Sequence, residues 1–344
     1  MGVYKTIMTV LLAAASVLAS VDASTATEKP AKELFGAVKL PSRSTPETYG
    51  FYSKGCISGA VAIPTDGPTW QAMRLSRNRR WGHPQMISLL ERLSRDAAQY
   101  DGWPGLLLGD ISQPRGGPML SGHASHQVGL DADIWLTPMP SRTLSAKERE
   151  DISATSMLKK NTFLTVDPSI WTPAHAAVIM RAASYPEVER IFVNPAIKKK
   201  LCETWSGERS ALGKVRPYYG HDYHFHVRIK CPADSAGCKE QAAVPAGDGC
   251  GKDLAWWFTD EPWAPPKKDP NAKPAPKPKP ARLADLPKAC ARVLDAPGPA
   301  SEAEVTLGNG FTPTVAAIGA GAVSTFADLP ARVPIPMARP SGDE

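Results

Sequence analysis

The chain has 344 residues, 42% of them hydrophobic, and a formal net charge of +6. A hydrophobic fraction of that size supports a packed core, and the length suits two average domains or one large domain with tails. So modest a positive charge does not by itself make a nucleic-acid binder, although it tolerates an anionic polymer as a partner. We therefore expect a globular protein that binds no nucleic acid.

The N-terminus has the features of a secretory signal peptide over residues 1–23. Lys5 precedes an apolar run from Ile7 to about Leu18, and Val21-Asp22-Ala23 places small residues at the −3 and −1 positions of a cleavage site. The alternative is a membrane anchor, but an apolar run of about twelve residues is shorter than the ~17–20 needed to span a bilayer. No other stretch of the sequence is long and apolar enough to cross a membrane. We expect secretion, with no membrane span once the signal is removed.

Periodicity along the chain predicts one α+β domain at residues 46–263, after a polar lead-in at 24–45. Helical patterns and period-two strand patterns follow one another irregularly in this domain. The expected helices are 84–100, 172–185 and 195–205, and the expected strands are 130–136, 188–193 and 223–230. Because the mixture lacks a regular βαβ rhythm, we expect a small antiparallel sheet flanked by helices rather than a doubly wound parallel sheet.

The composition changes after Trp263. Residues 264–295 begin with "APPKKDPNAKPAPKPKPAR", a Pro- and Lys-rich stretch typical of an extended linker. The following "LADLPKACARVL" has the pattern of a short helix that carries Cys290. Residues 296–344 are rich in Gly, Ala and Pro without clear periodicity, and we expect them to form a disordered tail.

The cysteines indicate disulfides. The chain has six of them, namely Cys56, Cys202, Cys231, Cys238, Cys250 and Cys290. In an oxidising compartment an even number implies disulfide bonds, and six cysteines allow about 15 pairings, among which the spacing does not choose. A structural zinc site is the alternative, but the sequence contains no C-x-x-C pair. We expect three disulfides that staple the fold.

Three of the seven histidines lie in "GHDYHFHVRIK", residues 220–230. Strand alternation places His224, His226 and Arg228 on one face, while the apolar residues between them take the other face. Because the apolar face is buried, the two strand histidines project from a rigid support, and His221 precedes the strand. That arrangement suits one metal ligand and one catalytic group, or two ligands. Taken alone, however, a His-x-His pair is more often a surface feature of a strand.

A second cluster lies upstream, in "SGHASHQVGLDADIW" at residues 121–135. It holds His123 and His126, followed by Asp131 and Asp133. Gly129 permits a tight turn before the strand, whose alternation places both aspartates on one side. Two roles are equally expected for Asp131. It either orients a histidine, or it is a solvated polar residue of the strand.

The two clusters together favour a metal site over a polar turn, because they contain five of the seven histidines. Histidine nitrogen and carboxylate oxygen suit Zn²⁺, and three protein ligands with an open fourth position are the arrangement of a catalytic zinc site. His126, Asp133 and His226 would supply those ligands. No H-E-x-x-H motif occurs, so a site carried by a single helix is absent from the sequence.

Four strings of the sequence resemble the penicillin-insensitive murein endopeptidases. They are "GHASHQVGLDADIW", "RIFVNPAIKKKLC", "KVRPYYGHDYHFHVRIKCPADS" and "GDGCG". These proteins are periplasmic zinc peptidases of the group that includes lysostaphin-type enzymes, D-Ala-D-Ala peptidases and the hedgehog fold. The resemblance extends from about Tyr49 to Cys290. H-x6-D with a later H-x-H is the zinc signature of the whole group, whereas the longer strings are particular to the murein endopeptidases.

The resemblance implies roles for individual residues. The implied zinc ligands are His126, Asp133 and His226, with His123 matching a further metal-binding histidine, His224 the catalytic histidine and His221 another functional histidine. The implied disulfides are Cys56–Cys290, Cys202–Cys250 and Cys231–Cys238. One departure concerns "KKNTFLTVDPSIWTP" at residues 159–173, which has no histidine where family members can carry an Asp-x-x-His pair of further ligands. We therefore expect a single catalytic zinc.

The resemblance also implies an activity and a location. A periplasmic enzyme of this family hydrolyses D-Ala–meso-diaminopimelate cross-links between peptidoglycan stem peptides, with zinc lowering the pKa of bound water towards ~7. His224 would handle protons or hold the developing oxyanion. No acyl-enzyme forms, so a β-lactam finds no serine to trap. Two alternatives stay open, a D,D- or L,D-carboxypeptidase on stem peptides and a non-catalytic protein that binds the cell wall.

Overall fold

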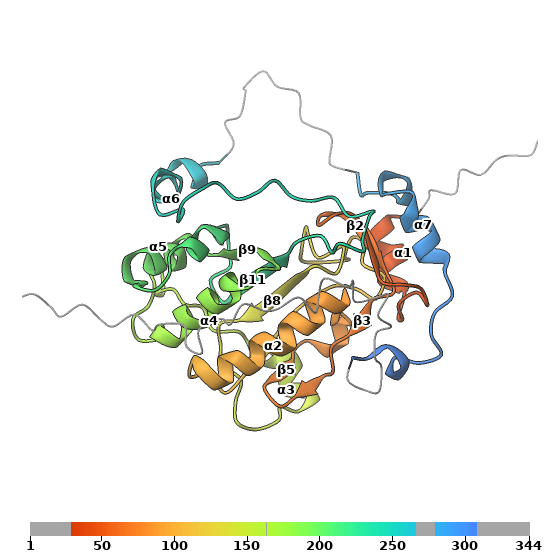
Figure 1. Cartoon of the computed structure of the whole chain (residues 1–344), viewed down its shortest axis with the longest axis horizontal. Helices are drawn as coiled ribbons and strands as arrows, with labels where there is room; N and C mark the ends of the chain where they lie inside the picture. Colours follow the sequence, from red (N-terminus) through yellow and green to blue (C-terminus); the bar gives the residue numbers. More distant parts are fainter. Residues whose placement is uncertain (1–28, 163, 266–278, 308–344) are drawn as a thin grey trace, which may run out of the picture.

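The computed structural model describes residues 29–162, 164–265 and 279–307, which form an α+β structure (Figure 1). The expected signal peptide at residues 1–23 lies outside the described residues. The helices are α1 (Ala31–Ala37), α2 (Pro84–Tyr100), α3 (Ala146–Asp151), α4 (Pro173–Ser184), α5 (Pro195–Thr204), α6 (Lys252–Trp256) and α7 (Ala289–Asp295). Short 3₁₀ turns are Leu75–Arg77, Ser210–Lys214, Glu261–Trp263, Leu283–Asp285 and Ala303–Val305.

A seven-stranded sheet runs through the middle of the described structure, in the order β10-β9-β11-β8-β7-β5-β4. Its strands are β4 (Asp66–Gly67), β5 (Trp70–Ala72), β7 (Leu106–Leu108), β8 (Asp131–Trp135), β9 (Val188–Val193), β10 (Val215–Pro217) and β11 (His224–Ile229). The pairs β10–β9 and β5–β7 are parallel, and the other neighbours are antiparallel. Two smaller sheets pair β1 (Glu47–Phe51) with β2 (Lys54–Ser58) and β3 (Val61–Ala62) with β6 (Trp81–Gly82).

The central sheet is larger than the small antiparallel sheet expected from the sequence, and it is mixed. Each parallel pair belongs to a strand–helix–strand unit, β5–α2–β7 and β9–α5–β10. The α+β class is confirmed, but the prediction of a purely antiparallel sheet is wrong. The cause is length, since β4, β5, β7 and β10 have two or three residues each and cannot show a period-two pattern.

The main core lies between the sheet and the helices α2 and α4. The helical face predicted for α2 is buried, and so are the apolar residues of β8 and β11 on one side of the sheet. Ile87, Leu90, Leu93, Ala97, Leu130, Ala132, Ile134, Phe225, Val227 and Ile229 all belong to this one cluster. Burial of each such side chain contributes about 1.5–3 kcal/mol. The middle strands of the sheet are therefore held rigidly from one face.

Both ends of the described chain form a second, smaller core against the β1–β2 hairpin (Figure 1). Helices α1 and α7 bury Phe35, Cys290 and Val293 around Cys56 of β2. The expected polar lead-in at residues 24–45 is thus wrong where α1 forms, because Phe35 is fully buried. A helix of seven residues is too short to be recognised by its periodicity. Helix α7 confirms the short helix that was expected around Cys290.

Residues 297–307 lie along the body instead of in the expected disordered tail. Leu307 donates its N–H to the carbonyl of Ala62 at 2.9 Å, and its side chain is 8% exposed. The N–H of Arg43 likewise donates to the carbonyl of Pro297 at 2.7 Å. The prediction of disorder is therefore wrong for 297–307, while 308–344 lie outside the described residues, as do 266–278 of the expected linker. We call α1, α7 and residues 297–307 the terminal layer.

Three disulfides connect distant parts of the described chain. They are Cys56–Cys290, Cys202–Cys250 and Cys231–Cys238, the pairs that the family resemblance implies. The first ties α7 to β2 across 234 residues of sequence. The last closes a loop of seven residues shortly after β11.

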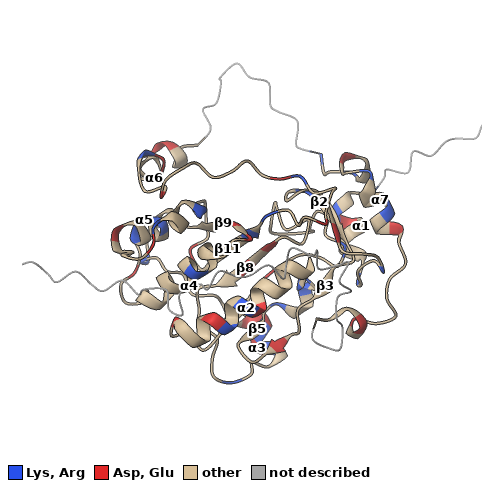
Figure 2. Cartoon of the chain, in the orientation of Figure 1, with Lys and Arg blue, Asp and Glu red and all other residues tan. Residues whose placement is uncertain are grey.

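Charged side chains of both signs are distributed over the elements of the described structure (Figure 2). Most of them lie at the surface, but a few ionised pairs are buried. Arg181 of α4, for example, makes a bidentate contact with Asp101 at 2.6 and 2.9 Å, and both side chains are about as buried as the apolar core around them. Among the helices that the structure describes, none combines the length and the apolar character that crossing a bilayer requires.

Candidate metal centre

The candidate site lies where β8 and β11 face each other in the middle of the sheet. The antiparallel register places His226 opposite Asp133, and Arg228 opposite Asp131. All four side chains are buried, on the face of the sheet away from the main core. The alternation predicted from the sequence is therefore present in both strands, and it points their polar residues towards one another.

The loop before β8 contributes His123 and His126. His126 has a left-handed backbone with φ of 65°, and its N–H donates to Oδ2 of Asp131 at 3.0 Å. Gly129 makes the tight turn that the sequence predicts, with φ of 70°, and a Cβ at this position would lie 2.6 Å from Cδ1 of Ile57. A left-handed residue other than glycine costs ~1–3 kcal/mol and persists where the surroundings enforce it, often at functional sites.

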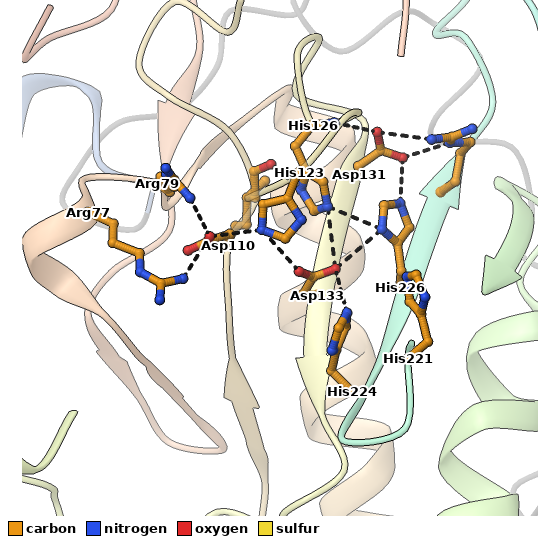
Figure 3. A network of polar contacts seen from close by, with 12 residues as sticks. Arg77, Arg79, Asp110, His123, His126, Asp131, Asp133, His221, His224 and His226 are labelled. Atoms are coloured by element: carbon orange, nitrogen blue, oxygen red, sulfur yellow. Dashed lines mark hydrogen bonds and ion pairs between the residues drawn. The ribbon is translucent and has the colours of Figure 1, made fainter. Parts of the chain in front are cut away.

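Four side chains converge in this region (Figure 3). One ligand atom from each of His123, His126 and Asp133 lies within 4.8 Å of the other two. His226 is outside this group of three but adjoins it, because its Nδ1 is 3.1 Å from Nε2 of His126 and 3.3 Å from Oδ1 of Asp133. The structure thus brings together the four residues that the sequence proposes as metal ligands.

The hydrogen-bonding pattern leaves a place for a cation among them. Nδ1 of His126 lies 2.7 Å from the carbonyl oxygen of Ile111, which can only accept, so Nε2 of this ring carries a lone pair. In the neutral ring of His226, Nε2 donates in the same way to Oδ1 of Asp131 at 2.9 Å, which leaves Nδ1 as an acceptor. Oδ1 of Asp133 is buried and has no hydrogen-bond partner in the part of the chain that the structure describes. Three acceptors that face one another without a donor fit a divalent metal, and nitrogen with carboxylate oxygen suits zinc.

Asp131 supports His226 from behind. It also accepts a hydrogen bond from Nε of Arg228 at 2.7 Å. Burial alone would raise the pKa of Asp131, but Arg228 and His226 outweigh it and hold this pKa far below its usual range. Burial lowers the pKa of His226, yet the carboxylates of Asp131 and Asp133 outweigh it and raise this pKa overall. A carboxylate behind a ligand histidine fixes the tautomer of the ring and strengthens its donor nitrogen.

Asp133 is the carboxylate at the centre of the cluster. Burial would raise its pKa, but His126 and His224 outweigh that effect and keep the pKa well below the usual range. Ring nitrogens of His126, His224 and His226 lie 3.3–3.5 Å from its Oδ1, too far for good hydrogen bonds. The negative charge of Asp133 is therefore available to a bound cation.

His224 and His221 lie next to the group of ligands rather than in it. Nε2 of His224 is 3.5 Å from Oδ1 of Asp133, and its Nδ1 is buried without a hydrogen-bond partner. Burial lowers the pKa of His224, so the neutral ring is favoured. His221 holds a left-handed backbone with φ of 55°, and its Nδ1 donates to the carbonyl of Tyr219 at 2.7 Å. Burial and the neighbouring His224 lower the pKa of His221 to about 3.

Asp110 is a member of the site that sequence reasoning missed. It follows β7, and its Oδ2 lies 3.0 Å from Nε2 of His123 and 2.8 Å from Nη1 of Arg79. Burial would raise its pKa, but His123 and Arg79 outweigh this and lower the pKa to about 2. No motif surrounds this aspartate. Its position beside His123 follows from the pairing of β7 with β8, and the sequence does not indicate that these two strands pair.

A cavity of about 440 Å³ opens beside the cluster. Asp133, His123 and His224 form part of its wall, together with Asp110, Tyr223 and Arg77. The candidate ligands are therefore deep in the protein but reachable from a space large enough for part of a peptide. A rigid support, converging donors and an adjacent cavity are the features of a catalytic metal site.

Comparison with known proteins assigns the chain to a family. The model of the penicillin-insensitive murein endopeptidase family matches residues 48–295. The chain belongs to this family. Three similar proteins are penicillin-insensitive murein endopeptidases. That of Haemophilus influenzae is 46% identical over 254 residues (72% of this chain, 82% of the relative), and those of Pectobacterium atrosepticum and Yersinia enterocolitica are each 40% identical, over 77% and 74% of this chain and 90% and 88% of the relatives.

Proposed function

We propose that this chain is a zinc metallopeptidase that hydrolyses the D-Ala–meso-diaminopimelate cross-links of peptidoglycan, in the periplasm. Membership of the murein endopeptidase family supports the substrate class. The observation that carries the proposal is the convergence of His126, Asp133 and His226 on a point where no donor is present. Disulfides and the signal-like N-terminus agree with a secreted protein.

His126, Asp133 and His226 would hold one zinc ion, with His123 at its side. Zinc bound by such a set supplies Lewis acidity, which activates water at neutral pH and polarises an amide carbonyl. Asp131 keeps the His226 ring in the tautomer that presents Nδ1. Asp110 acts similarly on His123, because the 3.0 Å contact fixes the direction of its ring. The second pair of ligands that family members can carry has no histidine here, so one metal is proposed.

His224 is the proposed catalytic residue. Its neutral ring lines the cavity beside Asp133, with a buried Nδ1 that has no hydrogen-bond partner among the described residues. A neutral imidazole in that position can accept a proton from the attacking water and pass it to the leaving amine, or donate to the developing oxyanion. His221 packs with a ring distance of 4.8 Å against His224 and is proposed to position it. Because no serine is acylated, β-lactams would not inhibit the enzyme.

Digestion of cross-linked muropeptides, followed by mass analysis, tests the proposal. The expected result is loss of dimers with release of intact monomers, abolished by a chelator and restored by zinc. Shortened monomers without loss of dimers would instead indicate a D,D- or L,D-carboxypeptidase. Unchanged muropeptides in the presence of bound zinc would indicate a protein that binds the cell wall without cleaving it.

A further inference from the structure

One wall of the cavity beside the metal centre carries arginines. Arg74 and Arg77 line it together with His224, and they lie at the two ends of one turn. The turn Leu75–Arg77 is a single 3₁₀ element between β5 and β6. Its sequence carries no motif, and neither arginine is needed for the proposed chemistry at the metal.

The backbone around this turn is strained. Arg74 and Asn78 flank it, and both have left-handed backbones with φ of 55° and 52°. The described residues include only three other positions of this kind outside glycine, and two of them are His126 and His221 of the metal centre. Such strain costs ~1–3 kcal/mol per residue and collects at ligand clamps and active sites. The turn is thus held in a particular shape beside the site.

The guanidinium groups of the two arginines differ in their hydrogen-bond partners. Arg74 is occupied by the protein, because its guanidinium donates to the carbonyls of Arg149 and Ile152 at 3.0 and 2.7 Å and lies 5.3 Å from the ring centre of Trp135. The guanidinium of Arg77 has a single hydrogen-bonded partner among the described residues, with Nη1 3.1 Å from Oδ2 of Asp110. Its side chain is 46% exposed and forms part of the cavity wall, so its remaining donors are available to a ligand.

The carboxylate of Asp110 does not need Arg77 for its neutralisation. Arg79, whose side chain is only 9% exposed, contacts the same oxygen at 2.8 Å, and His123 contacts it at 3.0 Å. Arg77 therefore leaves a surplus positive charge on the cavity wall. Proteins commonly bind a carboxylate through charge-assisted hydrogen bonds from a partly buried guanidinium.

We propose that Arg77 binds the carboxylate of the substrate residue that contributes the scissile nitrogen. In a D-Ala–diaminopimelate cross-link, the carbon attached to that nitrogen also carries a carboxylate. Contacts of 3.1, 3.0 and 3.5 Å link Arg77 to Asp110, then to His123, then to Asp133, so a group bound at Arg77 lies close to the metal centre. A carboxylate two bonds from the reacting nitrogen suits this separation.

This inference rests on the proposed peptidase function, but it does not depend on whether the enzyme is an endopeptidase or a carboxypeptidase. A D-Ala-D-Ala stem end, the substrate of a carboxypeptidase, carries a carboxylate at the same position relative to the scissile nitrogen. Arg77 would therefore be a specificity-determining residue for either reaction. It selects substrates in which this carboxylate is free over those in which it is amidated.

The test uses the full-length secreted protein and two muropeptide dimers. In one dimer the carboxylate next to the cross-link is free, and in the other it is the amide. We expect kcat/KM of the wild type to be about 10–100-fold higher for the free acid, because charge-assisted hydrogen bonds contribute that much discrimination. Arg77→Gln should bring the ratio close to one by raising KM for the free acid, and Arg77→Lys should retain part of it.

Two controls keep the result interpretable. Arg95→Gln removes an exposed arginine from α2, away from the cavity, and should keep the wild-type ratio. Bound zinc and the melting temperature should be the same in Arg77→Gln as in wild type, since Arg79 and His123 still neutralise Asp110. Equal cleavage of both dimers by wild type, or an unchanged ratio in Arg77→Gln, would overturn the role of Arg77 and leave the peptidase function standing. Failure of wild type with zinc bound to cleave either dimer would overturn the function itself.

Discussion

The metal centre and the terminal layer are both buried, but they are held by opposite kinds of interaction. The centre consists of histidines and carboxylates, several of them charged and one with an unpartnered oxygen, Oδ1 of Asp133. The terminal layer consists of apolar side chains such as Phe35 and Val293, tied to β2 by the Cys56–Cys290 disulfide. One region contains groups that destabilise a folded chain, and the other contains groups that stabilise it.

The difference separates stability from chemistry. A buried polar atom without a partner costs ~1–3 kcal/mol, so the centre persists only because the opposite faces of β8 and β11 are packed against α2 and α4. The terminal layer lies at another part of the molecule and lines no part of the cavity. Changes at the centre should therefore remove activity with little loss of stability, and changes in the layer should do the reverse.

The largest expected effect is that of His226→Ala. Without His226, the remaining ligands His126 and Asp133, with His123 at their side, would bind zinc poorly. We therefore expect metal and activity to be lost together, down to the background of the assay. The fold should remain, because Asp131 keeps its contact of 2.7 Å with Arg228. Metal analysis, circular dichroism and muropeptide digestion on the same sample measure all three quantities. Retention of both zinc and full activity would show that His226 is not a ligand.

His224→Ala should separate binding from catalysis. His224 is outside the group of ligands, so the variant is expected to keep about one zinc per chain. Loss of a general acid–base or of an oxyanion donor lowers kcat by ~10²–10⁴-fold. His224→Gln serves as the matched control, since it retains a hydrogen-bond donor without a titratable proton. If His224→Ala emptied the site while His226→Ala kept its zinc, the two roles would be reversed.

Loss of the Cys56–Cys290 disulfide should give the opposite result. On chain-entropy arithmetic, a link across 234 residues stabilises the fold by ~5.5 kcal/mol, and by less if the native geometry is strained. We expect the double variant Cys56→Ala/Cys290→Ala to lower the free energy of unfolding by several kcal/mol while kcat at 25 °C and bound zinc stay near wild type. Denaturant unfolding with and without zinc measures the change. An inactive but equally stable variant would contradict the separation of the two regions.

The sequence predicts the centre better than its surroundings. Alternation in "LDADIWL" and "YHFHVRIK" correctly indicates which side chains share a face, because strands of five or six residues are long enough to show a period of two. Periodicity does not give the pairing of the two strands, so the meeting of Asp133 with His226 is inferred from the ligand chemistry of the two clusters and from the family resemblance. The approach of Asp110 to His123 depends on a third, three-residue strand, for which no pattern exists.

The terminal layer shows what local patterns leave out. Its elements are short, and each is stabilised by residues far away in sequence, as Phe35 of α1 is by Cys290 and Val293 of α7. A Gly-, Ala- and Pro-rich composition indicates disorder only when no distant surface is available to bind the segment. For residues 297–307 that surface is the β3–β6 ribbon, which forms only after the chain has folded.

The smallest expected effect concerns this last segment of the layer. A chain that ends at Gly298 loses the buried side chain of Leu307 and the hydrogen bond from its backbone N–H to the carbonyl of Ala62. It also loses the ion pair of Glu302 with Arg80. Burial of one or two apolar side chains contributes ~1.5–3 kcal/mol each, and the conformational entropy gained when the segment is removed acts against this loss. Relative to a chain that ends at Leu307, we expect a loss of about 1–3 kcal/mol, or roughly 2–10 °C in melting temperature.

Leu307→Ala in the full chain should reproduce much of this loss, whereas Glu304→Gln should not. Glu304 makes only an exposed contact of 3.8 Å with Arg43, and such pairs contribute ~0–1 kcal/mol. Calorimetry of the four proteins side by side, with zinc saturating, gives the comparison, and kcat on a soluble muropeptide should be equal in all of them. Identical melting temperatures for the chains ending at 298 and at 307 would mean that the contacts of 299–307 add nothing to stability. A fall in kcat at unchanged stability would mean instead that the terminal layer acts on the metal centre, and the division between the two regions would not hold.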